Sequence, residues 1–382
     1  MDGPTEWNGL EIGYDVPAAP GMAEAEIVTP ALCLDLDALE RNLAAMQARA
    51  DAAGLTLRPH AKTHRSADVG RLQVAAGAVG LCCQTLSEAE ALARGGLTDL
   101  LVTNEVRGPR RAARAARLAQ RIRLGVCVDD TAGVAELAAA VLGTDAVLDV
   151  YVEIEVGNLR CGVPPGAPAA APAEAVAAAP GLRLAGLQAY HGKAQHIRDP
   201  AERRAAIDAA AGAVRETLAA LEAAGLPCPV VGGAGTGSWP YEAAAGLWTE
   251  LQCGSYAFMD ADYAAVPDET GAGPAFEHAL FVLAEVMSVP APGRAVCDAG
   301  LKALAMDSGP PRIMDREGLA WRGASDEHGI LDDPGETLAV GDRLRLIPGH
   351  CDPTCNLHDW YVGLRDGRVE ALWPVTARGK GF

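Results

Sequence analysis

The stretch "AVGLCCQTLSEAEALARGGLTDLLVTNEV", residues 78–106, contains one complete unit of the fold. Its first apolar run predicts a buried strand, and the Ala-rich stretch that follows predicts a helix. Ser87 and Glu90 have the spacing of a capping box at the start of that helix, and Gly95 and Gly96 predict its end. A second apolar run, DLLVTNEV, predicts the next strand. A strand, a helix and a strand in this order indicate a parallel sheet.

The same unit repeats from about residue 55. Eight strand-like runs alternate with helical patterns, which favours a (β/α)8 barrel of the α/β class over an open sheet. The runs are 56–63, 78–85, 99–106, 121–129, 147–157, 183–192, 229–237 and 250–258. The connection after the seventh run, SWPYEAAAG, is the shortest.

Two domains are expected because the sequence pattern changes along the chain. We assign the barrel to 28–275, because strand-like runs separated by Gly, Pro and Asp turns begin after it. This pattern predicts a β domain over 276–382. The polar segment 1–27 is expected to join that β domain.

Composition excludes several classes of protein. The formal net charge of −18 argues against binding to nucleic acid or to an anionic membrane surface. No apolar run approaches the roughly 20 residues that a membrane helix needs, and the N-terminus has no signal-peptide pattern. The ten cysteines are scattered through apolar runs, which is typical of reduced thiols in the cytoplasm and not of a disulfide framework.

Chemically unusual residues stand where the predicted strands end. Active sites of such barrels lie at the C-terminal ends of the strands, so residues that converge there from seven strands indicate an enzyme. They are Lys62, Gln84, Asn104, Glu105, Arg160, Tyr190, His191, Gly235, Thr236, Gly237, Ser255 and Tyr256.

Lys62 has two interpretations. Arg58, His60 and Lys62 share one face of an extended run, so all three are expected to point into the barrel. Lys62 is then either a structural lysine paired with Glu105 or Asp129, or a Schiff-base lysine whose pKa is lowered by burial and by neighbouring cations.

A glycine-rich turn, "GGAGTGS" at 232–238, follows the seventh run. Such turns let the backbone approach a phosphate, and barrels often bind phosphate after strands seven and eight. The turn lacks the Lys of a Walker loop. A phosphate site together with an inward lysine points to pyridoxal phosphate.

The stretch "PGHCDPTCNLHD", 348–359, is the densest cluster of possible metal ligands. Cys351, Cys355 and His358 have a spacing that a zinc knuckle can use, but no second cysteine pair lies near them in the sequence. His358 and Asp359 can also be simple turn residues. The residues alone leave open whether this is a structural zinc site or part of an active site.

Several motifs together resemble one family. "RPHAKTH", "VGNLRCGV", "LQAYHG", "GAGTGS", "ELQCGSYAFMD" and "HCDPTCNLHD" are similar to those of the D-threonine aldolase and 3-hydroxy-D-aspartate aldolase family, which belongs with the alanine-racemase-like, fold-type III pyridoxal phosphate enzymes. The likeness extends over nearly the whole chain. It implies a (β/α)8 barrel, a β domain and a homodimer with active sites near the subunit interface, and it makes Lys62 the cofactor lysine.

The resemblance also implies the cofactor contacts. Arg160 resembles the arginine that meets the pyridine nitrogen; a guanidinium there keeps the nitrogen unprotonated, so the ring is a weaker electron sink. The alternatives are a surface arginine at 160 and ordinary barrel-lining polar residues at 84 and 190. The implied cofactor set is Lys62, Gln84, Arg160, Tyr190, Thr236, Gly237, Gly254, Ser255 and Tyr256.

In the resemblance the metal ligands match His350 and Asp352. An imidazole and a carboxylate two residues apart suit Mg²⁺ or Mn²⁺ better than Zn²⁺. Related D-serine dehydratases place a Cys where Asp352 stands, and a thiolate favours zinc. The aspartate therefore favours an aldolase over a dehydratase.

The expected function is a lyase that uses pyridoxal 5'-phosphate and a divalent metal to cleave D-3-hydroxyamino acids to glycine and an aldehyde. 3-Hydroxy-D-aspartate, which releases glyoxylate, is favoured, and D-threonine, which releases acetaldehyde, is the close alternative. The runners-up are a D-serine or 3-hydroxyaspartate dehydratase and a non-catalytic pyridoxal phosphate carrier.

Two roles stay open. The general base is assigned to His191, with His196, His328 and a metal-bound hydroxide as alternatives. The second carboxylate of 3-hydroxyaspartate needs a cation, for which Arg107, Lys193 and Lys302 are candidates.

Overall fold

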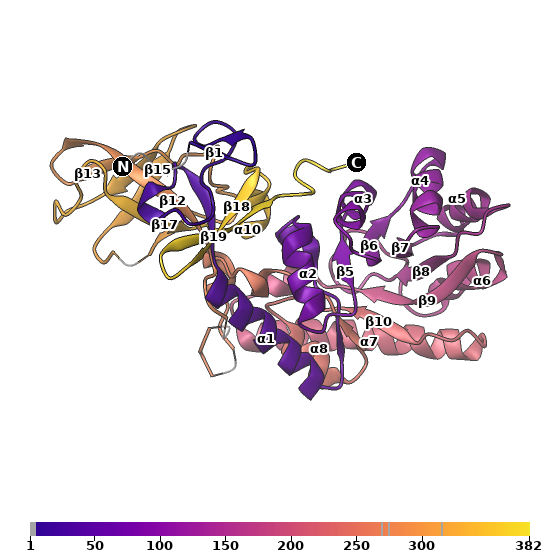
Figure 1. Ribbon diagram of the computed structural model, residues 1–382. Coiled ribbons are helices and arrows are strands. Elements are labelled where there is room, and N and C mark those ends of the chain that lie inside the picture. The colour runs from indigo at the N-terminus through magenta and orange to yellow at the C-terminus, as the bar shows by residue number, and fades with distance from the viewer. Residues whose placement is uncertain (1–4, 269, 274–275, 315) are drawn as a thin grey trace.

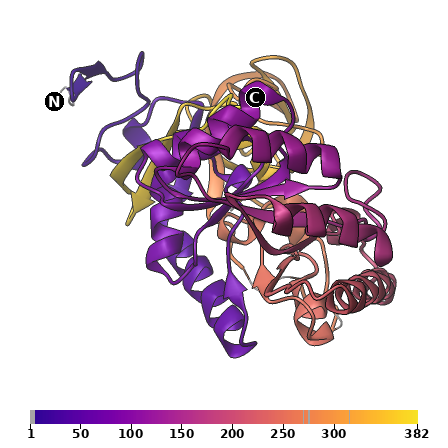
Figure 2. The same ribbon diagram turned by 90° about the vertical axis from the view of Figure 1, so that its right-hand side faces the viewer.

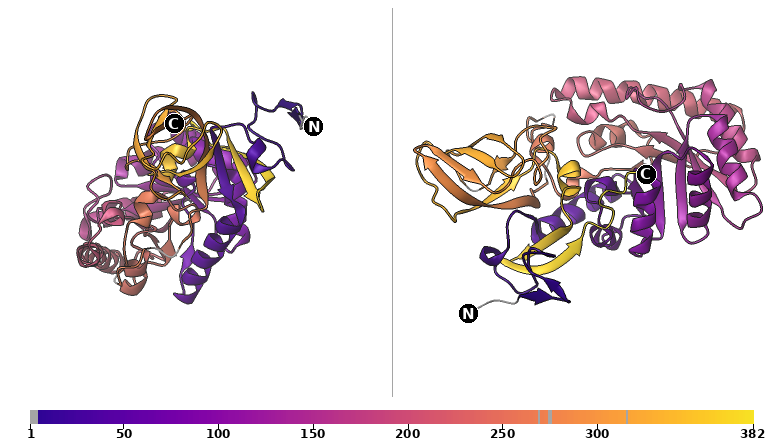
Figure 3. Two further views of the ribbon diagram at one scale, coloured as in Figure 1. Left: turned by 90° about the vertical axis from the view of Figure 1, so that its left-hand side faces the viewer. Right: turned by 90° about the horizontal axis from the view of Figure 1, so that it is seen from above.

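The computed structural model describes residues 5–268, 270–273, 276–314 and 316–382. The chain forms a barrel and a separate β domain (Figure 1), and the view from above in Figure 3 shows the two bodies side by side. The predicted domain boundary at 275 and 276 adjoins residues 274 and 275, which lie outside the described residues.

The barrel contains eight parallel strands, as predicted. They follow one another in the order β4-β11-β10-β9-β8-β7-β6-β5. A bridge between His60 and Cys82, with a hydrogen bond of 2.8 Å from Cys82 N to Pro59 O, joins the two ends of this order and closes the ring. The strands are β4 (Thr56–Leu57), β5 (Leu81–Cys83), β6 (Asp99–Glu105), β7 (Arg123–Val128), β8 (Leu148–Glu153), β9 (Leu182–Ala189), β10 (Val230–Gly233) and β11 (Glu250–Leu251).

Helices surround the strands, as Figure 2 shows in the view onto the barrel. The short seventh connection forms a helix, α8, as the repeat requires. Among the described residues, no helix has both the length and the apolar character needed to cross a bilayer. The helices are α1 (Leu36–Ala52), α2 (Ala67–Ala75), α3 (Leu86–Arg94), α4 (Pro109–Ala119), α5 (Thr131–Val141), α6 (Ala170–Ala178), α7 (Pro200–Ala223), α8 (Trp239–Ala245) and α9 (Ala261–Ala264).

The start of α3 differs from the sequence prediction. The N-cap is Thr85, whose hydroxyl accepts a hydrogen bond from Glu88 N at 3.1 Å. The predicted cap, Ser87, lies inside the first turn, where its hydroxyl contacts the carbonyl of Phe382. Thr85 and Glu88 have the same Thr-x-x-Glu spacing, so the capping pattern was placed two residues too late.

The β domain is built around β3 (Ala31–Asp35), which comes from the N-terminal part of the chain. β3 pairs antiparallel with β12 (Leu280–Ala291) and parallel with β18 (Trp360–Arg365). The sequence analysis assigned these residues to the barrel, and this boundary was wrong. An apolar five-residue run that is buried on both faces carries no local signal of which sheet it will join.

The other strands of this domain follow from turn signals. In the hairpin of β18 and β19 (Arg368–Pro374), Asp366 and Gly367 both have positive φ, as the Asp-Gly pair predicts. The remaining strands are β13 (Arg294–Cys297), β14 (Arg312–Ile313), β15 (Ala320–Ala324), β16 (Gly329–Asp332) and β17 (Arg343–Ile347), with β1 (Glu6–Trp7) and β2 (Leu10–Glu11) forming a small separate hairpin.

The segment before β3 lies along the β domain. Met22 O accepts a hydrogen bond from Val369 N at 2.9 Å, and Gly21 N donates to Val369 O at 2.7 Å. Glu24 forms an ion pair with Arg345 of β17 at 2.6 Å. This part of the N-terminal segment therefore packs on β17 and β19.

Charged side chains alternate across the N-terminal end of the barrel strands, and we call them the ionic belt. Arg58 is buried and contacts Glu250 at 2.9 Å and Asp99 at 2.6 Å, so it does point inward as predicted. β6, β7, β8 and β9 each add a charge opposite in sign to the one before it. The belt consists of Glu250, Arg58, Asp99, Arg123, Asp149 and Arg183.

Candidate active site

Lys62 lies in a short 3-10 turn, η2 (Ala61–Thr63), just past the end of β4. Its ammonium group contacts the carboxylate of Asp352 in α10 (Cys351–Cys355), so the barrel and the β domain meet at this point. The predicted partners of a structural Lys62, Glu105 and Asp129, are not the ones it has. The two residues are separated by 290 positions in the chain.

The charges of this pair stabilise each other. Burial alone would lower the pKa of Lys62, but the charge and hydrogen bond of Asp352, together with Tyr190 and Glu88, outweigh burial and raise it. The expectation of a lowered lysine pKa is therefore wrong for this state of the protein. Burial alone would raise the pKa of Asp352, but Lys62 and His350 hold it down at about 2.

His60 fixes the turn that carries Lys62. Its Nε2 lies 2.9 Å from Thr103 Oγ1, and its Nδ1 accepts a hydrogen bond of 3.3 Å from the backbone N–H of Lys62. Burial, and then the charge of Lys62, lower the pKa of His60 well below its usual value. A neutral imidazole therefore holds the lysine turn in place.

The predicted metal pair is adjacent in space. His350 Nε2 lies 3.8 Å from Asp352 Oδ1, and that oxygen is buried without a hydrogen-bond partner. Two ligands at about 2.1 Å from one ion can be up to about 4 Å apart, so a single Mg²⁺ or Mn²⁺ can reach both atoms. His350 Nδ1 lies 2.6 Å from Asp307 Oδ2, which leaves Nε2 to face the ion.

A zinc knuckle is not formed by the neighbouring cysteines. Over the part of the chain that the structure describes, no group of three or more His, Cys, Asp or Glu side chains could hold a metal. Cys351 and Cys355 are fully buried free thiols. His358 bonds to Ala303 O at 2.8 Å, so its role is structural.

Asp260, which the sequence analysis missed, anchors the metal segment to the barrel. Its two oxygens accept hydrogen bonds from Cys351 N at 3.0 Å and from Tyr263 N at 2.9 Å. Burial raises its pKa to about 6. Asp260 is the N-cap of α9, and an Asp ahead of a helical stretch was the signal available in the sequence.

The glycine-rich turn between β10 and α8 is filled from one side by Gln195. Gly237 N donates to Gln195 Oε1 at 3.0 Å, and a Cβ on Gly235 or Gly237 would lie closer than 3.0 Å to Gln195. The Gln195 amide in turn donates to Ser238 Oγ, which donates to Glu242 Oε1 at 2.7 Å. Gln195 was also missed by the sequence analysis.

Thr236 and the end of the eighth strand complete this cradle. Thr236 Oγ1 accepts a hydrogen bond of 3.0 Å from Tyr256 N, so its own hydroxyl proton remains to be donated. A Cβ on Gly254 would lie 2.6 Å from Thr63 Oγ1, so Gly254 and Ser255 pass directly beside the lysine turn. These contacts require a backbone without side chains, as a cradle for a phosphate does.

Tyr256 does not turn its side chain toward the cradle. Its hydroxyl accepts a hydrogen bond from Gln73 Nε2 at 3.2 Å, and its ring lies 5.7 Å from that of Phe276. The predicted cofactor contact of Tyr256 is therefore limited to its backbone, because the side chain belongs to the core between the two domains.

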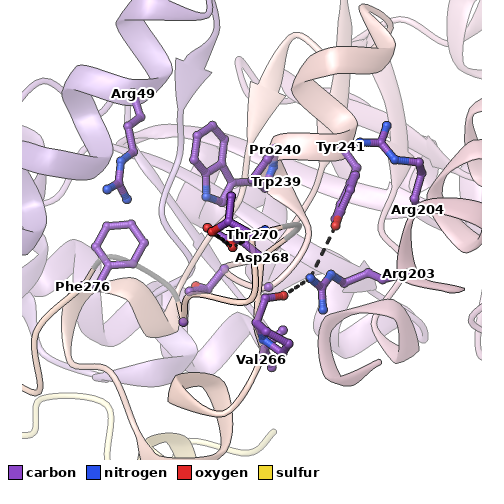
Figure 4. Close-up of a pocket in the computed structure, with 14 residues that line it drawn as sticks. Arg49, Arg203, Arg204, Trp239, Pro240, Tyr241, Val266, Asp268, Thr270 and Phe276 are labelled. Atoms are coloured by element: carbon purple, nitrogen blue, oxygen red, sulfur yellow. Dashed lines mark hydrogen bonds between the residues drawn. The ribbon is translucent and has the colours of Figure 1, made fainter. Parts of the chain in front are cut away.

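A cavity of about 530 Å³ lies on the outer side of the glycine-rich turn (Figure 4). Thr236 and Gly237 border it, and Arg203 and Tyr241 close another side with a hydrogen bond of 3.4 Å. Its described lining residues do not include Lys62. The cavity is thus separate from the meeting point of the lysine and the metal pair.

Gln84 and Tyr190 lie among the charges of the site. Gln84 Nε2 donates to Thr103 O at 3.3 Å, beside the His60 contact. Burial raises the pKa of Tyr190, Asp352 raises it further and Lys62 opposes both, which places the phenol close to the lysine pair. Arg160 is exposed and contacts Glu153 of β8 at 3.4 Å.

The two histidines after β9 have different surroundings. The ring of His191 packs against Gly157, and its Nδ1 is buried without a partner. His196 Nδ1 lies 2.6 Å from Asp262 Oδ2, the arrangement that orients an imidazole for proton transfer. His328 is exposed and lies 3.4 Å from Ser325 Oγ.

Two of the predicted carboxylate-binding cations are occupied elsewhere. Arg107 pairs with Asp130 at 2.8 Å, and Lys302 pairs with Glu327 at 2.6 Å on the surface. Lys193 begins η4 (Lys193–His196), between the two histidines, and is exposed. Of the three, Lys193 is the one placed beside the candidate base.

The comparisons with known proteins agree with this geometry. Residues 34–262 match the family model "Alanine racemase, N-terminal domain", and residues 279–364 match "Putative serine dehydratase domain". The chain is 51% identical to a 3-hydroxy-D-aspartate aldolase of Paracoccus denitrificans (strain Pd 1222), over 100% of both chains. The chain belongs to the 3-hydroxy-D-aspartate and D-threonine aldolase family.

Other members and relatives of this aldolase family agree with the assignment. The chain is 45% identical to a D-threonine aldolase of an Arthrobacter species, over 96% of this chain and 97% of the relative. The crystal structure of D-threonine aldolase from Filomicrobium marinum superimposes with a TM-score of 0.94 and 49% identity, over 96% of this chain and 100% of that one. A D-threo-3-hydroxyaspartate dehydratase of a Delftia species is more distant, at 34% identity over 90% of this chain and 96% of the relative.

Proposed function

We propose that this protein is an aldolase that depends on pyridoxal phosphate and a divalent metal and cleaves D-3-hydroxyamino acids to glycine and an aldehyde. The observation that carries the proposal is the meeting of Lys62 with the His350–Asp352 pair, in a chain 51% identical to a 3-hydroxy-D-aspartate aldolase. The β domain and the metal pair argue against a non-catalytic cofactor carrier.

The residues present fit the cofactor. Lys62 is the amine for its covalent attachment, and Thr236, Gly237, Gly254 and Ser255 form the cradle that would hold its phosphate. Gln84, Arg160, Tyr190 and the backbone of Tyr256 complete the proposed contacts. When bound, pyridoxal phosphate withdraws electrons from the substrate's Cα and so stabilises negative charge there.

The metal pair activates the substrate hydroxyl. His350 Nε2 and the unpartnered Oδ1 of Asp352 would hold Mg²⁺ or Mn²⁺, with water and substrate oxygens as the other ligands. Such an ion lowers the pKa of a hydroxyl group that it binds. The carboxylate, the oxygen ligands expected from water and substrate, and the absence of a thiolate from the pair support Mg²⁺ or Mn²⁺ over Zn²⁺.

One proton leaves the substrate and one is returned. A base takes the proton of the 3-hydroxyl, the oxygen becomes the carbonyl of the aldehyde as the Cα–Cβ bond breaks, and Cα then accepts a proton to give glycine. We assign the base to the histidines after β9. His191 is the side chain predicted from the sequence, and His196 is the alternative that already has a carboxylate partner.

The identity of the aldehyde follows from the relatives. Two 3-hydroxy-D-aspartate aldolases of Paracoccus denitrificans are 51% and 49% identical to the chain, against 45% for the D-threonine aldolase. We therefore favour 3-hydroxy-D-aspartate, with Lys193 as the cation for its second carboxylate, and D-threonine as the second substrate. We further propose a homodimer in the cytoplasm, where the ten free thiols would stay reduced.

Product analysis tests the function. The protein is incubated with D-3-hydroxyaspartate and with D-threonine, with and without a chelator. Glycine with glyoxylate or acetaldehyde, lost on chelation and restored by Mn²⁺, is the expected result. Ammonia with a keto acid would identify a dehydratase instead, and turnover that is insensitive to the chelator would refute the role of the metal.

Paired variants test the base. His191→Asn and His196→Asn each remove the imidazole while keeping a polar side chain. The variant of the true base should lose turnover by roughly 10²- to 10⁴-fold with little change in cofactor binding. If both variants keep wild-type turnover, a metal-bound hydroxide becomes the base.

A further inference from the structure

Two carboxyl groups, the buried Glu153 and the partly buried Glu105, lie at the mouth of the barrel outside the metal site. Glu105 ends β6 and Glu153 ends β8, so they flank the intervening strand β7. Glu153 is only 5% exposed. Glu105 Oε1 and Glu153 Oε2 are both buried, and neither oxygen has a hydrogen-bond partner among the described residues.

Arg160 is held directly above this pair by its loop. The base of the loop is closed by hydrogen bonds from Val163 N to Glu153 O at 2.9 Å and from Glu155 N to Val163 O at 3.0 Å. Gly162, with φ of +107°, allows the close approach of the returning chain. The guanidinium then donates to Glu153 Oε1 at 3.4 Å.

Two carboxyl groups near enough to influence each other's charge, each with a buried oxygen that has no donor, favour one shared proton over two negative charges. Burial, and next the charge of Glu105, raise the pKa of Glu153 to about 8, while Arg160 lowers it; a hydrogen bond from Glu105 accounts for part of the increase. One shared proton satisfies the two oxygens that lack other donors. The pair then carries one negative charge, which balances the single positive charge of Arg160.

We propose that Glu105 and Glu153 share one proton and together position Arg160, so that its guanidinium is directed at the pyridine nitrogen of the cofactor without net negative charge behind it. The inference rests on the proposed function for the presence of pyridoxal phosphate. A second ionised carboxylate at this place would favour protonation of the ring nitrogen and would make the ring a stronger electron sink. The shared proton prevents this.

The isosteric variant separates this role from simple packing. In Glu153→Gln the amide oxygen can still accept from Arg160 and the amide nitrogen can donate to Glu105, so the variant imitates the protonated acid with the same net charge. Glu153→Ala removes the acceptor of Arg160 and leaves Glu105 alone. Glu277→Ala, which breaks the exposed Arg41–Glu277 ion pair, is the matched control.

The experiment measures the dissociation constant of pyridoxal phosphate from the apoprotein and the absorption band of the bound cofactor. We expect roughly tenfold weaker binding and a shifted band in Glu153→Ala, and values within about threefold of wild type with an unshifted band in Glu153→Gln and in the control. Wild-type behaviour of Glu153→Ala would overturn the proposal. So would a Glu153→Gln variant that is as impaired as Glu153→Ala.

An infrared measurement tests the shared proton without the cofactor. The spectrum of the wild-type apoprotein minus that of Glu153→Gln should contain the carbonyl stretch of a protonated carboxyl group that titrates near pH 8. Subtraction cancels the bands of the other buried acids, such as Glu242, and a difference spectrum without this band would overturn the shared proton. Failure of the proposed function would give a different result from failure of this inference. Wild type and Lys62→Ala would then bind pyridoxal phosphate equally weakly and with the same absorption spectrum, whatever the infrared measurement shows.

Discussion

The ammonium group of Lys62 contacts the carboxylate of Asp352, so one ion pair joins the barrel to the β domain at the proposed centre of the chemistry. The same carboxylate offers its other oxygen toward His350. In the proposed site, Lys62 and the metal ion would therefore compete for one carboxylate when the cofactor is absent. Attachment of the cofactor to Lys62 would leave Asp352 to bind the ion.

Removal of the lysine charge should strengthen metal binding in the cofactor-free protein. In Lys62→Met, Asp352 loses its protein cation, and we expect roughly tenfold or tighter binding of Mn²⁺, measured by calorimetric titration of the apoprotein. His350→Ala should abolish binding in the same assay. An unchanged affinity in Lys62→Met would mean that lysine and metal do not compete.

Asp307 should support the metal site through His350. Its carboxylate lies 2.6 Å from His350 Nδ1 and fixes the ring, although it lies 43 positions away in the sequence. Asp307→Ala should weaken Mn²⁺ binding by roughly 10- to 100-fold. Asp208→Ala, an exposed change on α7, is the control, and equal affinity in the two variants would exclude this role.

Substitution in the glycine-rich turn should damage cofactor binding. A Cβ on Gly237 would lie closer than 3.0 Å to the backbone oxygen of Gln195, which cannot rotate away. Gly237→Ala should therefore release pyridoxal phosphate more readily, seen in equilibrium dialysis. Gly212→Ala in α7 has open space around it and should instead stabilise the protein by about 0.5–1 kcal/mol. Tight cofactor binding by Gly237→Ala would contradict the cradle.

The buried Glu242 should make stability depend on pH. Burial raises its pKa from 4.5 to about 7, so the folded protein binds this proton more strongly than the unfolded chain does. Its contribution is present at low pH and is lost as the pH rises from about 4.5 through about 7. The Glu242→Gln variant has no proton to lose at this position. Its free energy of unfolding, compared with that of wild type, should therefore increase by roughly 1–3 kcal/mol between about pH 4.5 and about pH 7. Thermal unfolding of both apoproteins at several pH values checks this, and a constant difference would refute it.

The ionic belt should contribute to stability and not to turnover. Arg58→Met leaves the buried Glu250 without its cation and should cost about 3–5 kcal/mol, seen as a lower unfolding midpoint. Turnover per folded molecule should stay the same, because the belt lies at the end of the strands opposite to Lys62. Arg41→Ala, which breaks an exposed pair, should cost about 1 kcal/mol or less.

Much of the site could be predicted because its signals are local. Lys62, the glycine-rich turn and His350 with Asp352 each stand in a short motif, and the alternation of apolar runs predicts the strands that carry the first two. The family resemblance then assigned their roles. What brings these motifs together is the ring of eight strands and the packing of α10 against η2.

Other parts of the site depend on contacts that no short pattern encodes. Gln195 fills the glycine-rich turn from 42 positions away, and Asp260 binds Cys351 N across 91 positions. The predicted partners of a structural Lys62 were chosen from residues at the ends of barrel strands. The observed partner, Asp352, comes from the β domain, which the positions of the barrel strands cannot indicate. The direction of the Tyr256 side chain could not be predicted because a residue's position at a strand end does not fix its rotamer.

The position of β3 has a consequence for how the protein is made. This strand leaves the ribosome early, yet both of its neighbours in the sheet, β12 and β18, are translated only after the whole barrel. A nascent chain must therefore carry an apolar, unpaired strand through most of its synthesis, a state that exposes it to misassociation. His350 and Asp352 emerge later still, so the barrel can be complete before the proposed metal ligands have been made.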